Sequence, residues 1–203
     1  MSILVINCNH WIGYHVVNAL LNHDYLVDGI ENEMESDDLS MFFGRNSLFS
    51  FYNQRQRKQY DTCICVGDYG KMEAVKANRI FFINPQESSG RMNLENTTTI
   101  LASHLFGEWM PMNKKGYYDQ QAFITFDSND FKENAIYIGD FTDGLIQWLG
   151  SSKISDKLEI KSEHKDGREN DASGNGIYIS ASLPLEKRVT ALQQHYVSNK
   201  NRR

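Results

Sequence analysis

The first thirty-two residues of the chain contain a strand, a helix and a second strand. Residues 3–6 form a continuous apolar run, which is typical of a strand buried on both faces. Apolar residues then recur at helical spacing and predict a helix over residues 12–21, and residues 25–30 predict the next strand. Two strands joined by a helix in so short a segment require a right-handed crossover, so we expect both in one parallel sheet.

The same alternation continues further along the chain. Apolar runs at 62–66, 79–84 and 97–102 predict three more strands. A short helix is predicted at 71–77 and a longer one around 47–59. Strands that alternate with helices predict an α/β fold built on a parallel sheet.

The composition of the sequence changes after Gly107. We therefore expect a core at 1–107 and a small subdomain at 108–203, together forming one compact unit. Residues 108–121 are rich in Pro, Gly, Asn and Tyr and predict a long loop or a small subdomain, and the polar segment 161–176 predicts a mobile loop. The remaining predicted elements are short strands at 123–126, 135–138 and 177–180, and helices at 140–149 and 185–197.

Composition excludes several classes of function. A formal net charge of -5 gives no reason to expect a nucleic-acid partner, and no apolar run is long enough to cross a membrane. Three cysteines without framework spacing, and an amino terminus without the features of a signal peptide, predict a reduced cytoplasmic protein. We expect the thiols of Cys63 and Cys65 to point to opposite faces of their strand, and the histidines lack metal-binding spacing, so no metal site is predicted.

Four segments of the chain resemble, in the right order, the extended short-chain dehydrogenases/reductases that act as nucleotide-sugar epimerases and dehydratases. They are the opening turn and the segments 100–111, 135–149 and 182–196. The resemblance implies a Rossmann-like, doubly wound parallel sheet, with a small and reduced substrate-type subdomain toward the C-terminus. Members of this family usually have about 300 residues or more, and the length missing from this chain falls in its middle.

The family binds NAD through a G-x-x-G-x-x-G turn between the first strand and the first helix. The corresponding positions here are Asn7, His10 and Gly13, with Trp11 and Ile12 between the last two. Asparagine tolerates unusual backbone angles, whereas a histidine side chain occupies space that the pyrophosphate needs. The resemblance therefore implies either no cofactor or weak NAD(H) binding at these residues.

An acidic residue at the end of the second strand hydrogen-bonds the adenosine ribose in this family. Glu31 lies at that position. It either favours NAD over NADP or simply begins an acidic loop, and the sequence leaves both interpretations open.

Catalysis in the family uses a Tyr-x-x-x-Lys pair on one face of a helix. The segment 88–96 resembles that region, with Ser89 at the tyrosine position and Asn93 at the lysine position. Neither side chain titrates near neutral pH. If this alignment holds, the redox machinery is absent, and the chain is interpreted as a pseudoenzyme.

The segment that contacts the substrate in the family is changed as well. Leu101, Ser103 and His104 stand where the family has Arg, Pro and Asn. A sugar-nucleotide diphosphate would need cations. The candidates are Arg91, Lys114 and Lys115, which we interpret as ordinary surface charges.

Three hypotheses remain open. In the first, the chain is a degenerate epimerase/dehydratase-like protein without redox catalysis that binds a sugar nucleotide, or pairs with itself or with a family paralogue. In the second, it is an atypical epimerase or reductase with weak NAD(H) affinity. In the third, it is a structural or regulatory partner with no small ligand.

Overall fold

The computed structural model describes residues 1–35, 38–56, 58–67, 75–85, 96–119, 122–151, 153–163 and 176–200. The predicted helix at 71–77 lies outside these residues except for its last positions, where a strand begins, and most of the loop predicted at 161–176 lies outside them as well. The chain divides into two compact units, which consist of residues 1–101 with 145–158 and residues 102–144 with 159–203.

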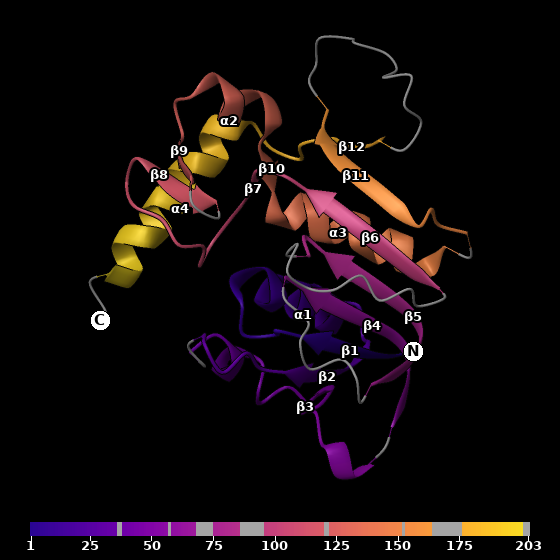
Figure 1. Ribbon diagram of the computed structural model, residues 1–203. Helices are drawn as coiled ribbons and strands as arrows, with labels where there is room; N and C mark the ends of the chain where they lie inside the picture. Colours follow the sequence, from indigo (N-terminus) through magenta and orange to yellow (C-terminus); the bar gives the residue numbers. More distant parts are fainter. Residues whose placement is uncertain are drawn as a thin grey trace. The chain divides into compact units, whose positions relative to one another are not determined.

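An eight-stranded sheet forms the framework of the fold, and its order is β12-β11-β6-β5-β4-β1-β2-β3 (Figure 1). Every strand pair described within it is parallel, which confirms the predicted α/β fold with a parallel sheet. The strands are β1 (Ser2–Ile6), β2 (Leu26–Ile30), β3 (Phe49–Phe51), β4 (Gln59–Val66), β5 (Lys76–Ile83), β6 (Thr97–Ala102), β11 (Lys157–Ser162) and β12 (Gly176–Ile179).

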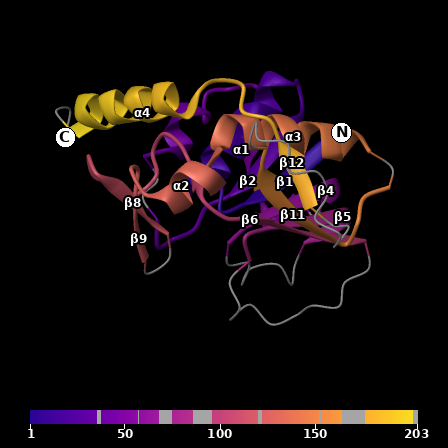
Figure 2. The ribbon, with the colours of Figure 1, turned by 90° about the horizontal axis from the view of Figure 1, so that it is seen from above.

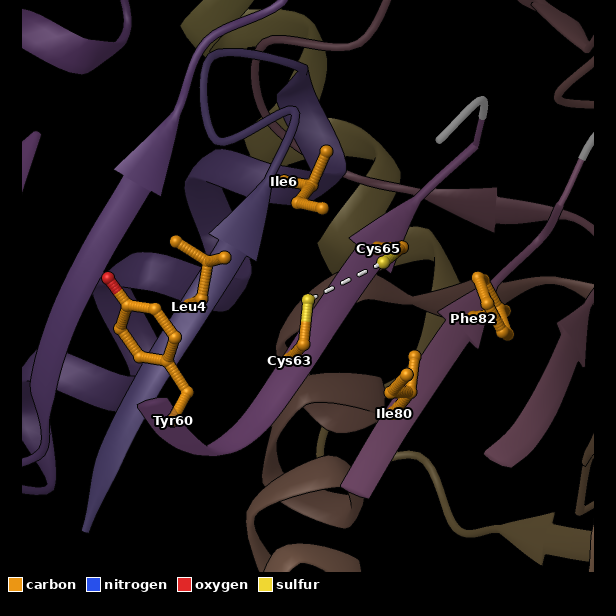
Figure 3. Close-up of a cluster of buried hydrophobic side chains, with 7 residues drawn as sticks. All are labelled: Leu4, Ile6, Tyr60, Cys63, Cys65, Ile80 and Phe82. Atoms are coloured by element: carbon orange, nitrogen blue, oxygen red, sulfur yellow. Dashed lines mark hydrogen bonds between the residues drawn. The ribbon is translucent and has the colours of Figure 1, made fainter. Parts of the chain in front are cut away.

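The central strands of the first unit carry its hydrophobic core. Helix α1 (Trp11–Asn22) connects β1 to β2, as predicted, and it buries the apolar positions that recur at helical spacing. Figure 3 shows a cluster of buried side chains on one face of β1, β4 and β5. Its members are Leu4, Ile6, Tyr60, Cys63, Cys65, Ile80 and Phe82.

The two cysteines of β4 lie on the same face of the sheet, with 3.7 Å between their sulfur atoms (Figure 3). The expectation that Cys63 and Cys65 point to opposite faces is wrong, because side chains alternate along a strand and residues two apart share a face. Both are free, fully buried thiols in an apolar cluster. Among the described residues no group of His, Cys, Asp and Glu side chains could hold a metal ion.

The helix predicted around 47–59 is also wrong. This segment contains strand β3 and a short 3₁₀ turn, Gln54–Gln56, and β4 begins at Gln59. Phe49 is buried and pairs with Val27 of β2, so its tertiary pairing overrides the helical pattern. Another 3₁₀ turn, Ser40–Phe42, precedes β3.

The second unit contains a small aromatic core, in which the ring of Phe131 contacts those of Phe106, Tyr117 and Phe126. The predicted short strands and both predicted helices of the C-terminal half are confirmed, as β9, β10, β12, α3 and α4, and in two views α4 runs alongside α2 and β8 (Figures 1 and 2). Among the described residues no helix is long and apolar enough to cross a membrane. The elements outside the eight-stranded sheet are β7 (Leu105–Phe106), β8 (Gly116–Asp119), β9 (Ala122–Thr125), α2 (Asn129–Asn134), β10 (Ile136–Tyr137), α3 (Ile138–Gly150), which continues into the first unit, and α4 (Leu185–Lys200).

Candidate functional site

The turn between β1 and α1 starts with an asparagine in the left-handed conformation. Asn7 has a φ of 61°, and its buried side chain donates a hydrogen bond of 2.6 Å to the backbone carbonyl of Val66. Glycine adopts this backbone conformation freely, and asparagine adopts it more readily than most other residues. Asn7 therefore forms this turn without a glycine at its position.

Gly13 lies where α1 packs closely against the turn. A β-carbon at this position would lie 2.1 Å from the backbone oxygen of Asn7. Only glycine lets α1 approach the turn this closely. Gly13 therefore serves the packing of α1 against the turn.

His10 caps the start of α1 with its own side chain. It is the N-cap residue of α1, and its Nδ1 accepts a hydrogen bond of 3.3 Å from the backbone amide of Ile12. Burial lowers the pKa of His10 to about 4, so the imidazole is neutral at pH 7. A neutral side chain therefore accepts the hydrogen bond of one of the backbone amides that the helix would offer to an anion.

The low pKa of His10 predicts a pH-dependent stability. Because the unfolded imidazole titrates near 6.5 and the folded one at about 4, stabilisation is complete above pH 6.5 and is lost as the pH falls toward 4. We expect this residue to contribute at most roughly 3 kcal/mol across that window. Urea unfolding at pH 7 and pH 4.5 measures it.

The control for this measurement is His10→Asn, which retains a capping side chain but does not titrate. The variant should lose less stability than the natural chain between the two pH values. Equal losses in the two proteins would contradict a half-buried, neutral His10.

The end of β2 is joined to the same turn by side-chain hydrogen bonds. The amide of Asn9 donates to the carbonyl of Asn32 at 3.0 Å and accepts from its backbone amide at 2.7 Å. The Glu31 carboxylate accepts a hydrogen bond from the buried hydroxyl of Ser40. Glu31 is therefore bound within the protein at one oxygen, and whether it also contacts a ribose stays a prediction.

The residues of this turn do not fit a pyrophosphate held against the start of α1. The imidazole of His10 lies at the helix terminus and already binds the Ile12 amide. It brings no positive charge at neutral pH to replace the amide that it covers. Trp11, the first helical residue, places its ring 6.0 Å from that of His10 and adds bulk beside it.

The two positions predicted to replace the catalytic pair of the family lie in a part of the chain that the structure does not describe. Ser89 and Asn93 lie outside the described residues, as does Arg91, so the alignment of that segment stays a prediction. Ser103 and His104 form the turn between β6 and β7, where His104 has a φ of 56° and its Nε2 lies 2.9 Å from the Asp130 carboxylate.

A network of polar side chains connects β10 and α3 with the start of α4. The Tyr137 hydroxyl donates to both carboxylate oxygens of Glu108, at 3.0 and 2.9 Å. The Arg188 guanidinium lies 3.8 Å from the centre of the Tyr137 ring. The buried Asp140 accepts a hydrogen bond of 2.5 Å from the Ser182 hydroxyl. Burial and the charge of Glu108 raise the pKa of Tyr137 to about 12, so this phenol is protonated at neutral pH.

Lys114 and Lys115 take part in a second arrangement that sequence reasoning missed. Both line a cavity of about 460 Å³ together with Asn113, Tyr196, Val197 and Lys200. The signal in the sequence was the i, i+4 spacing of Tyr196 and Lys200 on one helix face. The sequence alone does not show that this helix face lies beside the two lysines of the turn.

Neither protein-family models nor curated proteins match this chain. Solved structures do match it. Yeast methylglyoxal/isovaleraldehyde reductase Gre2, complexed with NADPH, is 13% identical, with a TM-score of 0.61 over 99% of this chain and 100% of its own. The dTDP-glucose 4,6-dehydratase of Bacillus anthracis, in complex with NAD, is 9% identical, with a TM-score of 0.60 over 99% of this chain and 98% of its own.

A third match is the UDP-glucose 4-epimerase of Thermotoga maritima with UDP-glucose, which is 11% identical, with a TM-score of 0.59 over 98% of this chain and 99% of its own. The matched proteins are short-chain dehydrogenases/reductases of the NAD-dependent epimerase/dehydratase kind. The chain therefore has the Rossmann-like fold of this class, which confirms the fold that the sequence resemblance implies.

Proposed function

We propose that this chain uses the fold of the NAD-dependent epimerases and dehydratases for binding, without redox catalysis. The observation that carries the proposal is the contact between His10 and the Ile12 amide at the start of α1. A side chain of the protein stands where the fold usually receives a pyrophosphate. This supports the interpretation of the chain as a pseudoenzyme with no cofactor or with weak NAD(H) affinity.

The ligand that we propose is a sugar nucleotide. Two of the structural neighbours act on, or are complexed with, nucleotide-linked glucose, namely the dTDP-glucose dehydratase and the UDP-glucose epimerase. A protein of this fold can lose the dinucleotide site of its first unit and keep ligand-binding surfaces elsewhere, because function resides in sites rather than in the fold. We further propose that the chain pairs with a second copy or with an active paralogue.

Equilibrium titration of the natural chain with a panel of UDP- and dTDP-sugars tests this proposal. We expect micromolar dissociation constants for at least one sugar nucleotide. Sedimentation of the chain, alone and mixed with an active paralogue, tests the pairing. Failure of every sugar nucleotide to bind would contradict the proposed ligand and would leave the pairing as the remaining activity.

A second candidate function is an atypical enzyme with weak NAD(H) affinity. It is favoured by two features of the turn, the left-handed backbone of Asn7 and the close contact of Gly13 with its carbonyl. These keep the path of the backbone that the family turn requires. In this case the only obstacle to the dinucleotide would be the side chains at positions 7 and 10.

Replacing both Asn7 and His10 with glycine separates the two candidates. If these side chains are the obstacle, the double variant should bind NAD at least about tenfold more tightly than the natural chain, because the Ile12 amide becomes free for phosphate. Calorimetric titration measures the difference. His10→Asn is the matched control, since it keeps a helix cap and should gain no affinity. An unchanged affinity in the glycine variant would mean that the rest of the pocket is lost as well.

A further inference from the structure

The cavity beside the last turns of α4 lies entirely within the second unit, and we name it the lysine pocket. It has a volume of about 460 Å³, which is within the range of small-ligand sites. Its lining comes from the turn before β8 and from one face of the helix end, namely Asn113, Lys114, Lys115, Tyr196, Val197 and Lys200.

The turn that carries two of the lysines is held firmly by its own hydrogen bonds. Asn113 Oδ1 accepts from the backbone amides of Lys115 and Gly116, at 2.8 and 3.2 Å, and the backbone amide of Asn113 donates to the Gly116 carbonyl at 2.8 Å. Gly116 itself packs against β9, because a β-carbon there would lie 2.1 Å from the backbone oxygen of Ile124. The positions of the two lysine backbones are therefore fixed before any ligand arrives.

The same turn is joined to the elements on either side of it. Gln193 of α4 donates a hydrogen bond of 2.9 Å to the carbonyl of Lys114. The backbone amide of Phe126 donates at 3.0 Å to the carbonyl of Lys115. Because both carbonyls are bound, the side chains of the turn are presented to the pocket by a pre-organised backbone, which lowers the entropy cost of binding.

The pocket concentrates positive charge that the protein does not neutralise. Three of its lining residues are lysines and none is acidic. In the described part of the chain, Lys114, Lys115 and Lys200 form no ion pair with any carboxylate. Three exposed lysines that line one pocket, in a chain whose net charge is -5, attract a small anion more readily than an extended polyanion, because the excess negative charge of the chain disfavours the latter.

An aromatic ring lies beside the charges. Tyr196 is half-buried, and the Lys200 ammonium lies 6.0 Å from the centre of its ring. Val197, on the same helix, adds an apolar side chain to the lining of the pocket. A ring and an apolar side chain next to three cations suit a ligand that combines a planar base with phosphate groups.

We propose that the lysine pocket binds a nucleoside diphosphate group, with the diphosphate against Lys114, Lys115 and Lys200 and the base against Tyr196. The identification of the ligand as a sugar nucleotide rests on the proposed function. The location of the anion rests on the pocket itself. Under this proposal Lys114 and Lys115 bind a ligand, whereas the sequence alone favours ordinary surface charges.

Calorimetric titration with UDP-glucose, UDP, pyrophosphate and uridine tests the assignment. The natural chain should bind the first two, bind pyrophosphate more weakly and bind uridine weakest of all, and the affinities of the charged ligands should fall as salt is added. A variant with Lys114, Lys115 and Lys200 all replaced by alanine should bind UDP-glucose at least about tenfold more weakly, because it loses the charge-assisted contacts. Thermal unfolding verifies that the variant is folded.

Lys187→Ala is the matched control, because Lys187 is exposed on α4 but does not line the pocket. It should leave the affinity unchanged. Full affinity of the triple variant for UDP-glucose would overturn the assignment of the pocket while leaving the proposed function intact. Lysine-dependent binding of pyrophosphate alone would overturn the nucleoside assignment, and no binding of any ligand by the natural chain would overturn both proposals.

Discussion

Gly13→Ala should destabilise the chain by about 3 kcal/mol or more, the largest effect that we expect from a single methyl group. The added β-carbon would lie 2.1 Å from the carbonyl oxygen of Asn7, and also within 3.1 Å of the Cys8 α-carbon. All the nearest atoms belong to the backbone, so no side-chain rotation can relieve the clash. The start of α1 would have to move away from β1, and the buried apolar face of the helix would lose its packing.

Gly150→Ala is the matched control for this substitution. Gly150 ends α3, and a β-carbon there would meet no atom within 4 Å. We expect its effect on stability to be small, because alanine is favoured over glycine in a helix. The free energies of unfolding of the two variants, from urea titrations, provide the comparison. A Gly13→Ala variant as stable as Gly150→Ala would contradict the close approach of α1 to the turn.

Asp28→Ala should cost about 2 to 3 kcal/mol, the second large effect. Asp28 is a buried carboxylate in the middle of β2, and it accepts hydrogen bonds from the Tyr60 hydroxyl at 2.5 Å and from the Lys58 ammonium at 2.9 Å. Tyr60 is fully buried, so its hydroxyl would lose its partner where water cannot replace it. Burial, together with its bond to Asp28, already raises the pKa of Tyr60 well above the usual range, so the phenol remains a donor.

Chemical denaturation of Asp28→Ala, Tyr60→Phe and the double variant measures this contact as a coupling free energy. The double variant should be more stable than the sum of the two single losses predicts, because removing both partners leaves no unpaired buried group. Asp143→Ala is the control, since Asp143 is exposed on α3, and it should change stability little. Strict additivity of the two substitutions would contradict the hydrogen bond.

The elements that the sequence predicted correctly are those with a clear apolar period. The run of residues 3–6 and the helical repeat that follows determine β1 and α1 because each buries its own apolar positions. The segment around β3 was misread because a three-residue strand becomes stable only by pairing with β2, a contact that local pattern does not contain. Helix α2 was missed because six residues are too few for a period, although the hydroxyl of Ser128, its N-cap, accepts from the Phe131 amide.

The candidate sites show the same division between local and tertiary information. The unusual backbone of Asn7 could be anticipated, because it depends on the turn itself. The capping bond from the Ile12 amide to His10 depends on a side-chain rotamer, so the sequence indicated bulk at that position but not a helix cap. The lysine pocket depends on how α4 packs against the turn before β8, which no local pattern specifies.

The central claim is that His10 closes the dinucleotide site, and calorimetric titration of the natural chain with NAD, NADH and NADP at neutral pH tests it most directly. At this pH the imidazole is neutral and holds the Ile12 amide. We predict no binding at micromolar concentrations of any of the three. Micromolar binding of any one of them would mean that the side chain moves aside for the pyrophosphate, and it would contradict the account.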